Sequence, residues 1–289
     1  MFHTFQGAEP LTTLPIHLLA QTYDFYTFDK LLKFKLQGKH IQRVIKYRVE
    51  GMKQNGIRVP QDCETLADAV NLAHDSHEHP QKYVDQDDNP RHLNKIVLGK
   101  GKYPTKGNRL EIFSAVNIVG DPEVPKEKIV VVSGIEFKRG IQGNCHLQHL
   151  TLRQANECGV YGKSSFTMDD VLVEQCGYYG VWASGTGVVV RCTNMEVREC
   201  GWSGVVASNG GSITLIGAKT TVHHNCTKGT SDFMSLKVFG LKVFGASSTI
   251  QLVSPLTKEQ VAIDNYGGGN WGADTSYGGD INQIKTINE

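Results

Sequence analysis

VEQCGYYGV, residues Val173–Val181, is one copy of a repeated motif that decides the fold of this chain. LRQANECGV precedes it at Leu152–Val160, VRECGWSGV follows at Val197–Val205, and VHHN at Val222–Asn225 begins a shorter fourth copy. Equivalent positions are 21, 24 and 25 residues apart. Repeats with such periods are typical of solenoids, in which each repeat forms one turn and packs against its neighbours. The sequence therefore predicts a solenoid.

Short runs of alternating apolar and polar residues accompany the repeat, as expected for strands with one buried face. The runs are IEFK from Ile135, LTLR from Leu150, VLVE from Val171, MEVR from Met195 and TTVH from Thr220. When the runs are stacked in parallel, their last residues form an outward row of Lys138, Arg153, Glu174, Arg198 and His223. Strands in a sheet lie about 4.8 Å apart, so Glu174 is expected between two arginines.

The segments between these runs distinguish two kinds of solenoid. The leucine-rich-repeat consensus is missing, and Val, Gly and Thr dominate the return segments. The pattern therefore predicts a mainly β protein, a right-handed parallel β-helix of about seven coils. Gly159, Gly180 and Gly204 recur four residues after the small residues of a corner, where we expect a positive φ. Those small residues are Ala155, Cys176 and Cys200, followed by Asn225 in the fourth copy.

A helix is predicted to precede the solenoid. Glu64–Ala73 has apolar residues at helical spacing, and a polar loop over residues 74–94 separates it from IVLGKGKY (Ile96–Tyr103) and VNIVGD (Val116–Asp121). This order resembles the entrance of pectin-lyase-like β-helix proteins, in which a helix caps the first coil. The resemblance spans residues 59–254. It implies the fold but indicates almost nothing about catalytic or binding residues.

Three regions are expected: a small helical module (1–58), the β-helix with its cap helix (59–263) and a flexible Gly-rich tail (264–289). The module contains three short helical segments, Leu14–Leu19, Phe28–Leu36 and Lys39–Ile45, and their order resembles an F-box. The family's Cys-Arg-x-Trp ending is replaced by Lys39–Gln42. The resemblance implies a skp-like adaptor as partner, faced by Leu14, Pro15, Leu18, Leu19, Leu31 and Leu32. The alternative is a helical cap or a dimerisation arm.

Charged residues within the repeat are the only weak candidates for catalysis. Asp169 and Asp170 are adjacent, and adjacent strand residues point to opposite faces, so one of them could face a groove. A two-carboxylate hydrolase needs a second acid about 5 to 9 Å away, and Glu174 is the nearest. Arg153, Glu174 and Arg198 also superficially fit a calcium-dependent lyase. We expect instead that the doublet lies in a turn or on a solvated face, because the charge row already accounts for Glu174, and that the row itself is structural, as alternating charge on a parallel sheet usually is. The residue set of galacturonan hydrolases is also missing.

Aromatic residues in the turns form the candidate binding site. They are Tyr161, Tyr178, Tyr179, Trp182 and Trp202. Tyr161 and Trp182 occupy equivalent outward positions one coil apart. Exposed aromatic clusters bind sugar rings or the hot spots of protein partners. Aromatic residues in turns can also simply cover the neighbouring coil, and the sequence leaves both interpretations open.

The composition argues against several classes of partner and cofactor. The 30 basic and 29 acidic residues leave a net charge of +1, which argues against nucleic acid and anionic membranes as partners. No apolar stretch is long enough to span a membrane, and residues 1–10 lack the pattern of a secretion signal. The seven cysteines are expected to be reduced and mostly buried, which indicates an intracellular protein. No phosphate-binding, dinucleotide or metal-ligand motif is present, so no cofactor or metal is expected.

The sequence thus favours a non-enzymatic recognition scaffold, in which a β-helix binds a protein target and an F-box-like segment binds an adaptor. Two alternatives remain. One is a carbohydrate-active β-helix enzyme of the lyase or hydrolase kind, or its inactive descendant. The other is a structural subunit of a virion or another assembly.

Overall fold

The chain divides into two units, residues up to 96 and residues 97–289. The computed structural model describes residues 15–21, 28, 31, 39–229 and 237–288. Each unit is described by itself.

The first unit is mainly helical. Its elements are α1 (Ile16–Gln21), α3 (Lys39–Asn55), β1 (Ile57–Val59), α4 (Leu66–Glu78) and the 3₁₀ turn η1 (Pro80–Lys82), and β2 (Lys95–Leu98) contains the division between the units. Thr65 caps α4, because its hydroxyl accepts a hydrogen bond from the backbone N–H of Asp68 at 3.1 Å. The predicted helix is confirmed. It extends to Glu78, beyond the predicted start of the polar loop, because Ser76 is buried and donates to the carbonyl of Ala73 at 2.7 Å.

α3 is longer than the short helical segment predicted from Lys39 to Ile45. It continues through Asn55, and Val44, Val49 and Met52 are buried along it. The spacing of these residues places them on one face of the helix.

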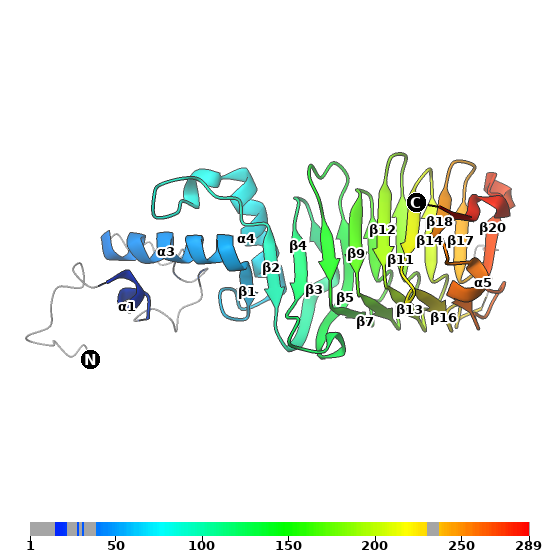
Figure 1. The fold of residues 1–289 in the computed structure, drawn as a ribbon, viewed down its shortest axis with the longest axis horizontal. Coiled ribbons are helices and arrows are strands. Elements are labelled where there is room, and N and C mark those ends of the chain that lie inside the picture. The colour runs from blue at the N-terminus through cyan, green and yellow to red at the C-terminus, as the bar shows by residue number, and fades with distance from the viewer. Residues whose placement is uncertain (1–14, 22–27, 29–30, 32–38, 230–236, 289) are drawn as a thin grey trace, which may run out of the picture. The chain divides into compact units, whose positions relative to one another are not determined.

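The second unit is a parallel β-solenoid (Figure 1). Its first strands are β3 (Gly101–Ile112), β4 (Asn117–Gly120), β5 (Ile129–Phe137), β6 (His146–Gln148), β7 (Thr151–Arg153), β8 (Val160–Gly162), β9 (Phe166–Asp169), β10 (Leu172–Glu174), β11 (Val181–Ser184) and β12 (Val189–Thr193). The later strands are β13 (Glu196–Arg198), β14 (Val205–Ser208), β15 (Ser212–Ile216), β16 (Thr221–His223), β17 (Leu241–Phe244), β18 (Thr249–Val253), β19 (Ala262–Ile263), β20 (Trp271–Asp274) and β21 (Ile284–Ile287). Helix α5 (Lys258–Val261) and the 3₁₀ turns η2 (Lys126–Lys128), η3 (Thr275–Tyr277) and η4 (Ile281–Gln283) lie in its connections.

Three parallel ladders form the faces of the solenoid. The first ladder runs β4-β6-β9-β12-β15-β18-β21, the second β5-β7-β10-β13-β16-β19, and the third β5-β8-β11-β14-β17-β20, with β3 beside β5. Five turns, from β6–β8 to β18–β20, contribute one strand to every ladder. The predicted solenoid is therefore confirmed, but with about five turns in place of seven, because the entrance strands β3–β5 do not form regular turns.

The predicted register is confirmed for four of the five runs. Val173 pairs with Leu152 on one side and Val197 on the other, and Val197 pairs with Val222. The run from Ile135 was placed in the wrong ladder, because β5 is long enough to serve two faces. Its residues 130–132 pair with β7, whereas residues 135–137 pair with β8. Val132, and not Lys138, is thus the neighbour of Arg153.

The left-handed backbone of the corners lies at residues that the sequence pattern did not single out. Two rows of non-glycine residues have φ between 50° and 57°: His149, Asp170 and Asn194 before the second ladder, and Gln154, Gln175, Glu199 and His224 after it. The expectation of positive φ at Gly159, Gly180 and Gly204 is wrong. Glycine is needed there for close packing, because a Cβ at Gly180 would lie 2.6 Å from the carbonyl oxygen of Gly204 in the next turn. Ala155, Cys176, Cys200 and Asn225 are buried, as predicted for the row of small residues.

The segment predicted to be a flexible tail instead continues the solenoid. β20 pairs with β17, and β21 pairs with β18. The turn at Asp280 is capped by its own carboxylate, which accepts from the N–H of Asn282 at 2.9 Å. The glycines and polar residues of this region therefore form tight turns between short strands.

The cysteines are buried, as predicted, and all seven are free thiols. Among the described helices, none has the length and apolar character needed to cross a membrane.

Candidate functional site

The outward row of the third ladder changes from aromatic to cationic along the solenoid. Tyr161 on β8 pairs with Trp182 on β11, Trp182 with Val206 on β14, and Val206 with Lys242 on β17. The preceding residue of each of these strands is a completely buried Val or Leu. Strand alternation therefore turns this row outward.

Two aromatic pairs stack across successive turns. The ring centroids of Tyr161 and Trp182 are 4.2 Å apart with an interplanar angle of 14°, and those of Tyr178 and Trp202 are 4.3 Å apart at 17°. Tyr179 joins the pairs, because its ring meets Trp182 edge-on at 5.3 Å and Trp202 edge-on at 5.5 Å. The predicted cluster is thus a single packed unit of five rings.

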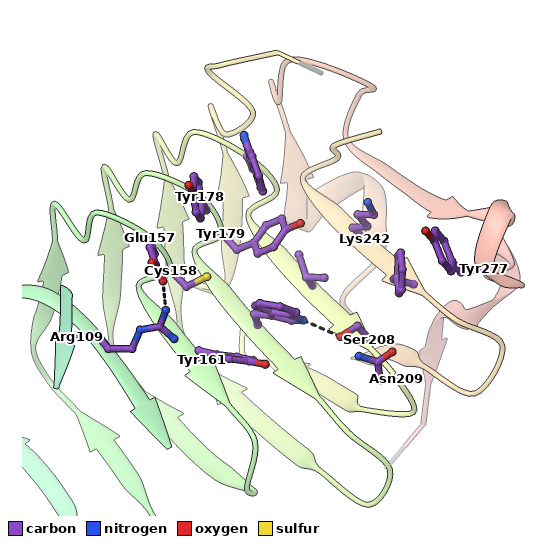
Figure 2. Close-up of a pocket in the computed structure, with 14 residues that line it drawn as sticks. Arg109, Glu157, Cys158, Tyr161, Tyr178, Tyr179, Ser208, Asn209, Lys242 and Tyr277 are labelled. Carbon is purple, nitrogen blue, oxygen red and sulfur yellow. Dashed lines mark hydrogen bonds and ion pairs between the residues drawn. The ribbon is translucent and has the colours of Figure 1, made fainter. Parts of the chain in front are cut away.

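This cluster lines a cavity of about 420 Å³, here called the aromatic cavity (Figure 2). Its lining consists of Arg109, Glu157, Cys158, Tyr161, Tyr178, Tyr179, Trp182, Trp202, Val206, Ser208, Asn209, Lys242, Phe244 and Tyr277. All five aromatic residues predicted for the binding site are among them. A largely apolar cavity of this size with a few polar groups is typical of a binding site.

The aromatic cavity has an ion pair at each end. At one end Arg109 pairs with Glu157 and also, at 2.9 Å, with the buried carboxylate of Glu136. At the other end, the almost completely buried Lys242 lies 3.4 Å from Asp274. Burial lowers the pKa of Lys242 more than its contact with Asp274 raises it. Because Arg109 is paired with two carboxylates and Lys242 with one, neither cation of the described cavity lining is left unpaired.

Burial keeps two residues of the cavity, Cys158 and Tyr179, neutral. Burial raises the pKa of Cys158 to about 11 and the pKa of Tyr179 to about 12. A thiolate is the nucleophilic form of cysteine, so Cys158 is inert at neutral pH. The hydroxyl of Tyr179 is therefore a neutral group that can donate or accept a hydrogen bond.

The weak catalytic candidates lie elsewhere, and Asp170, Glu174 and Arg198 are held in ion pairs. Asp170 occupies a left-handed corner, where it contacts Lys126 at 2.6 Å and the Nδ1 of His149 at 2.7 Å. Burial opposes the charged form of Asp170, but these two partners prevail and lower its pKa. Asp169, on β9, is half-buried and accepts a long hydrogen bond from Gln148.

Glu174 lies between two arginines, as the sequence predicts. Arg153 contacts one of its carboxylate oxygens, and Arg198 contacts the other at 2.7 Å. Glu174 is buried, and the two arginines are each about one-third exposed. Neither the acidic doublet nor this charge row lines the aromatic cavity.

The adaptor-facing candidates fall largely outside the described residues. Leu14 and Leu32 lie outside them, and so do the side chains of Leu18 and Leu19. Pro15 is exposed directly before α1, whereas Leu31 is only 1% exposed.

Several residues of the cavity wall were missed by sequence reasoning. Arg109 comes from β3, which joins the third ladder across a register shift between Pro104 and Arg109. Lys242 and Phe244 lie in the second copy of the duplicated pentapeptide LKVFG. An alignment of LKVF at Leu241–Phe244 with VVAS at β14 would have found them. Tyr277 was not predicted for the site, because its segment is predicted from sequence to be a flexible tail.

No group of three or more His, Cys, Asp or Glu side chains that could hold a metal ion occurs in the described part of the chain. Comparison with known proteins finds no match among protein-family models, curated proteins or solved structures.

Proposed function

We propose that this protein is a recognition scaffold whose aromatic cavity binds a segment of a protein partner. The observation that carries the proposal is the convergence of six Tyr and Trp rings, together with Arg109, in one cavity. Tyr, Trp and Arg are the residue types that dominate the binding energy of protein interfaces. Tyr178, which is 39% exposed, and Tyr277, which is 60% exposed, place two of the rings in reach of a partner.

The orientation of the rings supports a protein partner over a carbohydrate. A sugar ring stacks on an exposed aromatic face, but the facing sides of Tyr161 and Trp182 cover each other. The Nζ of Lys163 lies 4.9 Å from the centre of the Tyr161 ring, which is the position of a cation over its face. Tyr178 stacks on Trp202, and the Nζ of Lys228 lies 5.9 Å from the centre of the Tyr178 ring. The cluster therefore offers mainly ring edges and the exposed parts of Tyr178 and Tyr277, which suit apolar side chains.

The charges of the cavity also weigh against hydrolysis of a glycoside. A two-carboxylate mechanism needs two acids that flank the substrate. Glu157 is the only carboxylate among the described residues that line the cavity, and it is paired with Arg109. The charges of the aromatic cavity therefore favour binding over catalysis.

The proposal extends to the F-box-like segment, which would connect the scaffold to a skp-like adaptor. The exposed Pro15 at the start of α1 supports a docking role for this end of the segment. Leu31 is buried and belongs to the core of its own unit, so it is a poor test residue. Co-precipitation of a purified skp-like adaptor should be lost in Leu18→Asp. Undiminished co-precipitation in Leu18→Asp would refute binding through the F-box-like segment. No co-precipitation by the wild-type protein would remove the adaptor role. Either outcome leaves the scaffold role standing.

The binding role is tested by selecting from a phage-displayed library of random dodecapeptides on the intact protein. We expect an enriched family with an aromatic or aliphatic anchor. Its affinity should fall at least about tenfold in Tyr178→Ala and in Tyr277→Ala, because truncation of a central aromatic costs about 1.4 kcal/mol or more. Tyr266→Ala is the matched control, since Tyr266 is 55% exposed and does not line the cavity. Failure to enrich any peptide that depends on Tyr178 would overturn the proposal.

A further inference from the structure

A second groove adjoins the aromatic cavity and has a different chemistry. It measures about 450 Å³ and is lined by Arg139, Lys163, Ser184, Gly185, Thr186, Val188 and Asn209, here called the basic groove. Asn209 lines both spaces. A ligand that fills the aromatic cavity can therefore continue directly into the basic groove.

The basic groove carries positive charge with no carboxylate in its described lining. Arg139 is exposed and makes no ion pair with any residue that the structure describes. Lys163 contacts Glu136 at 2.8 Å, which engages one of the three N–H donors of its ammonium group. Glu136 is itself shared with Arg109 at 2.9 Å and Lys138 at 3.2 Å, so three cations share this one buried acid.

The polar residues of the basic groove add neutral donors. Asn209 is exposed and donates its amide to the hydroxyl of Ser184 at 3.1 Å. This bond uses one amide N–H and leaves the other for a ligand. Thr186, on an exposed turn, contributes a further hydroxyl. Two cations with neighbouring amide and hydroxyl donors form a suitable site for an anionic group.

We infer that the peptide segment bound in the aromatic cavity carries an acidic group beside its apolar anchor, and that Arg139 and Lys163 bind this group. The inference rests on the proposed function, since it names the chemistry of the same partner. Lys163 connects the two sites, because it lines the basic groove and its Nζ lies over the ring of Tyr161, which lines the aromatic cavity. The acidic group is a carboxylate or a phosphate, both of which accept charge-assisted hydrogen bonds from arginine and lysine.

An acidic peptide fits better than an acidic polysaccharide. A polyanionic polysaccharide carries a charge at every one or two sugar units. Among the described lining residues, the cations that can accept a ligand lie in the basic groove, whereas the charges of the aromatic cavity are already paired. A single anionic group next to an apolar side chain matches this division.

The test begins with the strongest dodecapeptide selected on the intact wild-type protein. We expect an Asp or Glu within a few residues of the apolar anchor. Replacing that acid by its amide should weaken binding about fivefold to tenfold, the loss expected for a charge-assisted contact at a partly exposed site. Synthetic peptides with Asp or phosphoserine at this position distinguish the two sources of the anion.

Protein variants provide the reciprocal test. Arg139→Gln and Lys163→Gln should each weaken the acidic peptide several-fold and bind its amide analogue as the wild type does. Arg139→Glu should restore affinity for a peptide in which the acid is changed to lysine. Lys219→Gln is the control, because Lys219 is exposed and lines neither space.

The outcomes separate the two proposals. Peptides that depend on Tyr178 but show no acid, or bind Arg139→Gln and Lys163→Gln unchanged, would overturn the inference and leave the proposed function intact. Loss of all Tyr178-dependent binding would overturn both. Displacement of the peptide by oligogalacturonide or heparin fragments at lower concentration than by free acidic peptide would assign the groove to a polysaccharide and refute the inference.

Discussion

Gly180→Ala tests the packing of the turns most sharply. A methyl group at this position would lie 2.6 Å from the backbone carbonyl oxygen of Gly204 and closer still to Cγ1 of Val197. Val197 is completely buried and β-branched, so its side chain has little freedom to move away. The carbonyl oxygen of Gly204 accepts a ladder hydrogen bond from the N–H of Val181 at 2.9 Å. It cannot retreat without loss of that bond.

The expected cost follows from these two contacts. Overpacking of a buried position costs about 1 to 3 kcal/mol, and a weakened backbone hydrogen bond adds about 0.5 to 1.5 kcal/mol. We therefore expect Gly180→Ala to lower the free energy of unfolding by about 3 kcal/mol. Urea denaturation followed by far-ultraviolet circular dichroism measures this loss, as a midpoint about 1 M lower for a slope near 3 kcal/mol/M.

Two variants make the experiment decisive. Gly99→Ala is the control, because a Cβ at Gly99 meets nothing within 4 Å, and its stability should change by less than about 0.5 kcal/mol. Gln175→Gly should be neutral or slightly stabilising, since Gln175 has φ of 57° and glycine adopts this conformation without strain. Equal stability of Gly180→Ala and Gly99→Ala would refute the account of close packing between turns.

Three further outcomes are expected. Glu174→Gln should destabilise the protein by about 2 kcal/mol in urea denaturation, because it leaves two partly exposed arginines without their buried acid, whereas the exposed Glu199→Gln should change stability by less than about 0.5 kcal/mol. Burial opposes the charged form of His149, but its contact with Asp170 prevails and raises its pKa. The resulting contribution to stability is fully present below about pH 6.5 and is lost as pH rises through the folded pKa. The free energy of unfolding should therefore fall less between pH 6 and pH 8 in His149→Asn than in the wild type, and an equal fall would contradict the assignment. Burial raises the pKa of Cys192 to about 12, so mass spectrometry should find this thiol unmodified by iodoacetamide at pH 8 until urea unfolds the chain.

Sequence periodicity was sufficient to predict the solenoid, because each turn repeats the same pattern of buried, exposed and corner residues. The alternation around Val173 determines which side chains face inward, and the charge of Glu174 between Arg153 and Arg198 determines the register. The run from Ile135 was misplaced for a reason that periodicity cannot reveal. A single strand, β5, bends at Ser133, where φ is 140°, and contributes to two faces.

The candidate site was only half predictable, for a related reason. Tyr161 and Trp182 occupy equivalent positions in regular turns, so their pairing follows from the repeat. Lys242 lies 36 residues after its ladder neighbour Val206, outside the 21- to 25-residue spacing of the repeat, and Arg109 precedes the first regular turn. Their place in the cavity depends on three-dimensional contacts between turns of unequal length. The basic groove is formed in the same way, by loops that the repeat does not specify.

Intrinsic fluorescence tests the central claim most directly, because two of the three tryptophans, Trp182 and Trp202, line the aromatic cavity. In the Trp271→Phe variant these two are the only tryptophans, and excitation selective for tryptophan reports on them alone. Titration with the selected dodecapeptide should change their emission with the same Kd that anisotropy of the labelled peptide gives, and Tyr178→Ala should shift both curves together. Binding by anisotropy with no change in tryptophan emission would place the partner elsewhere on the molecule and contradict the account.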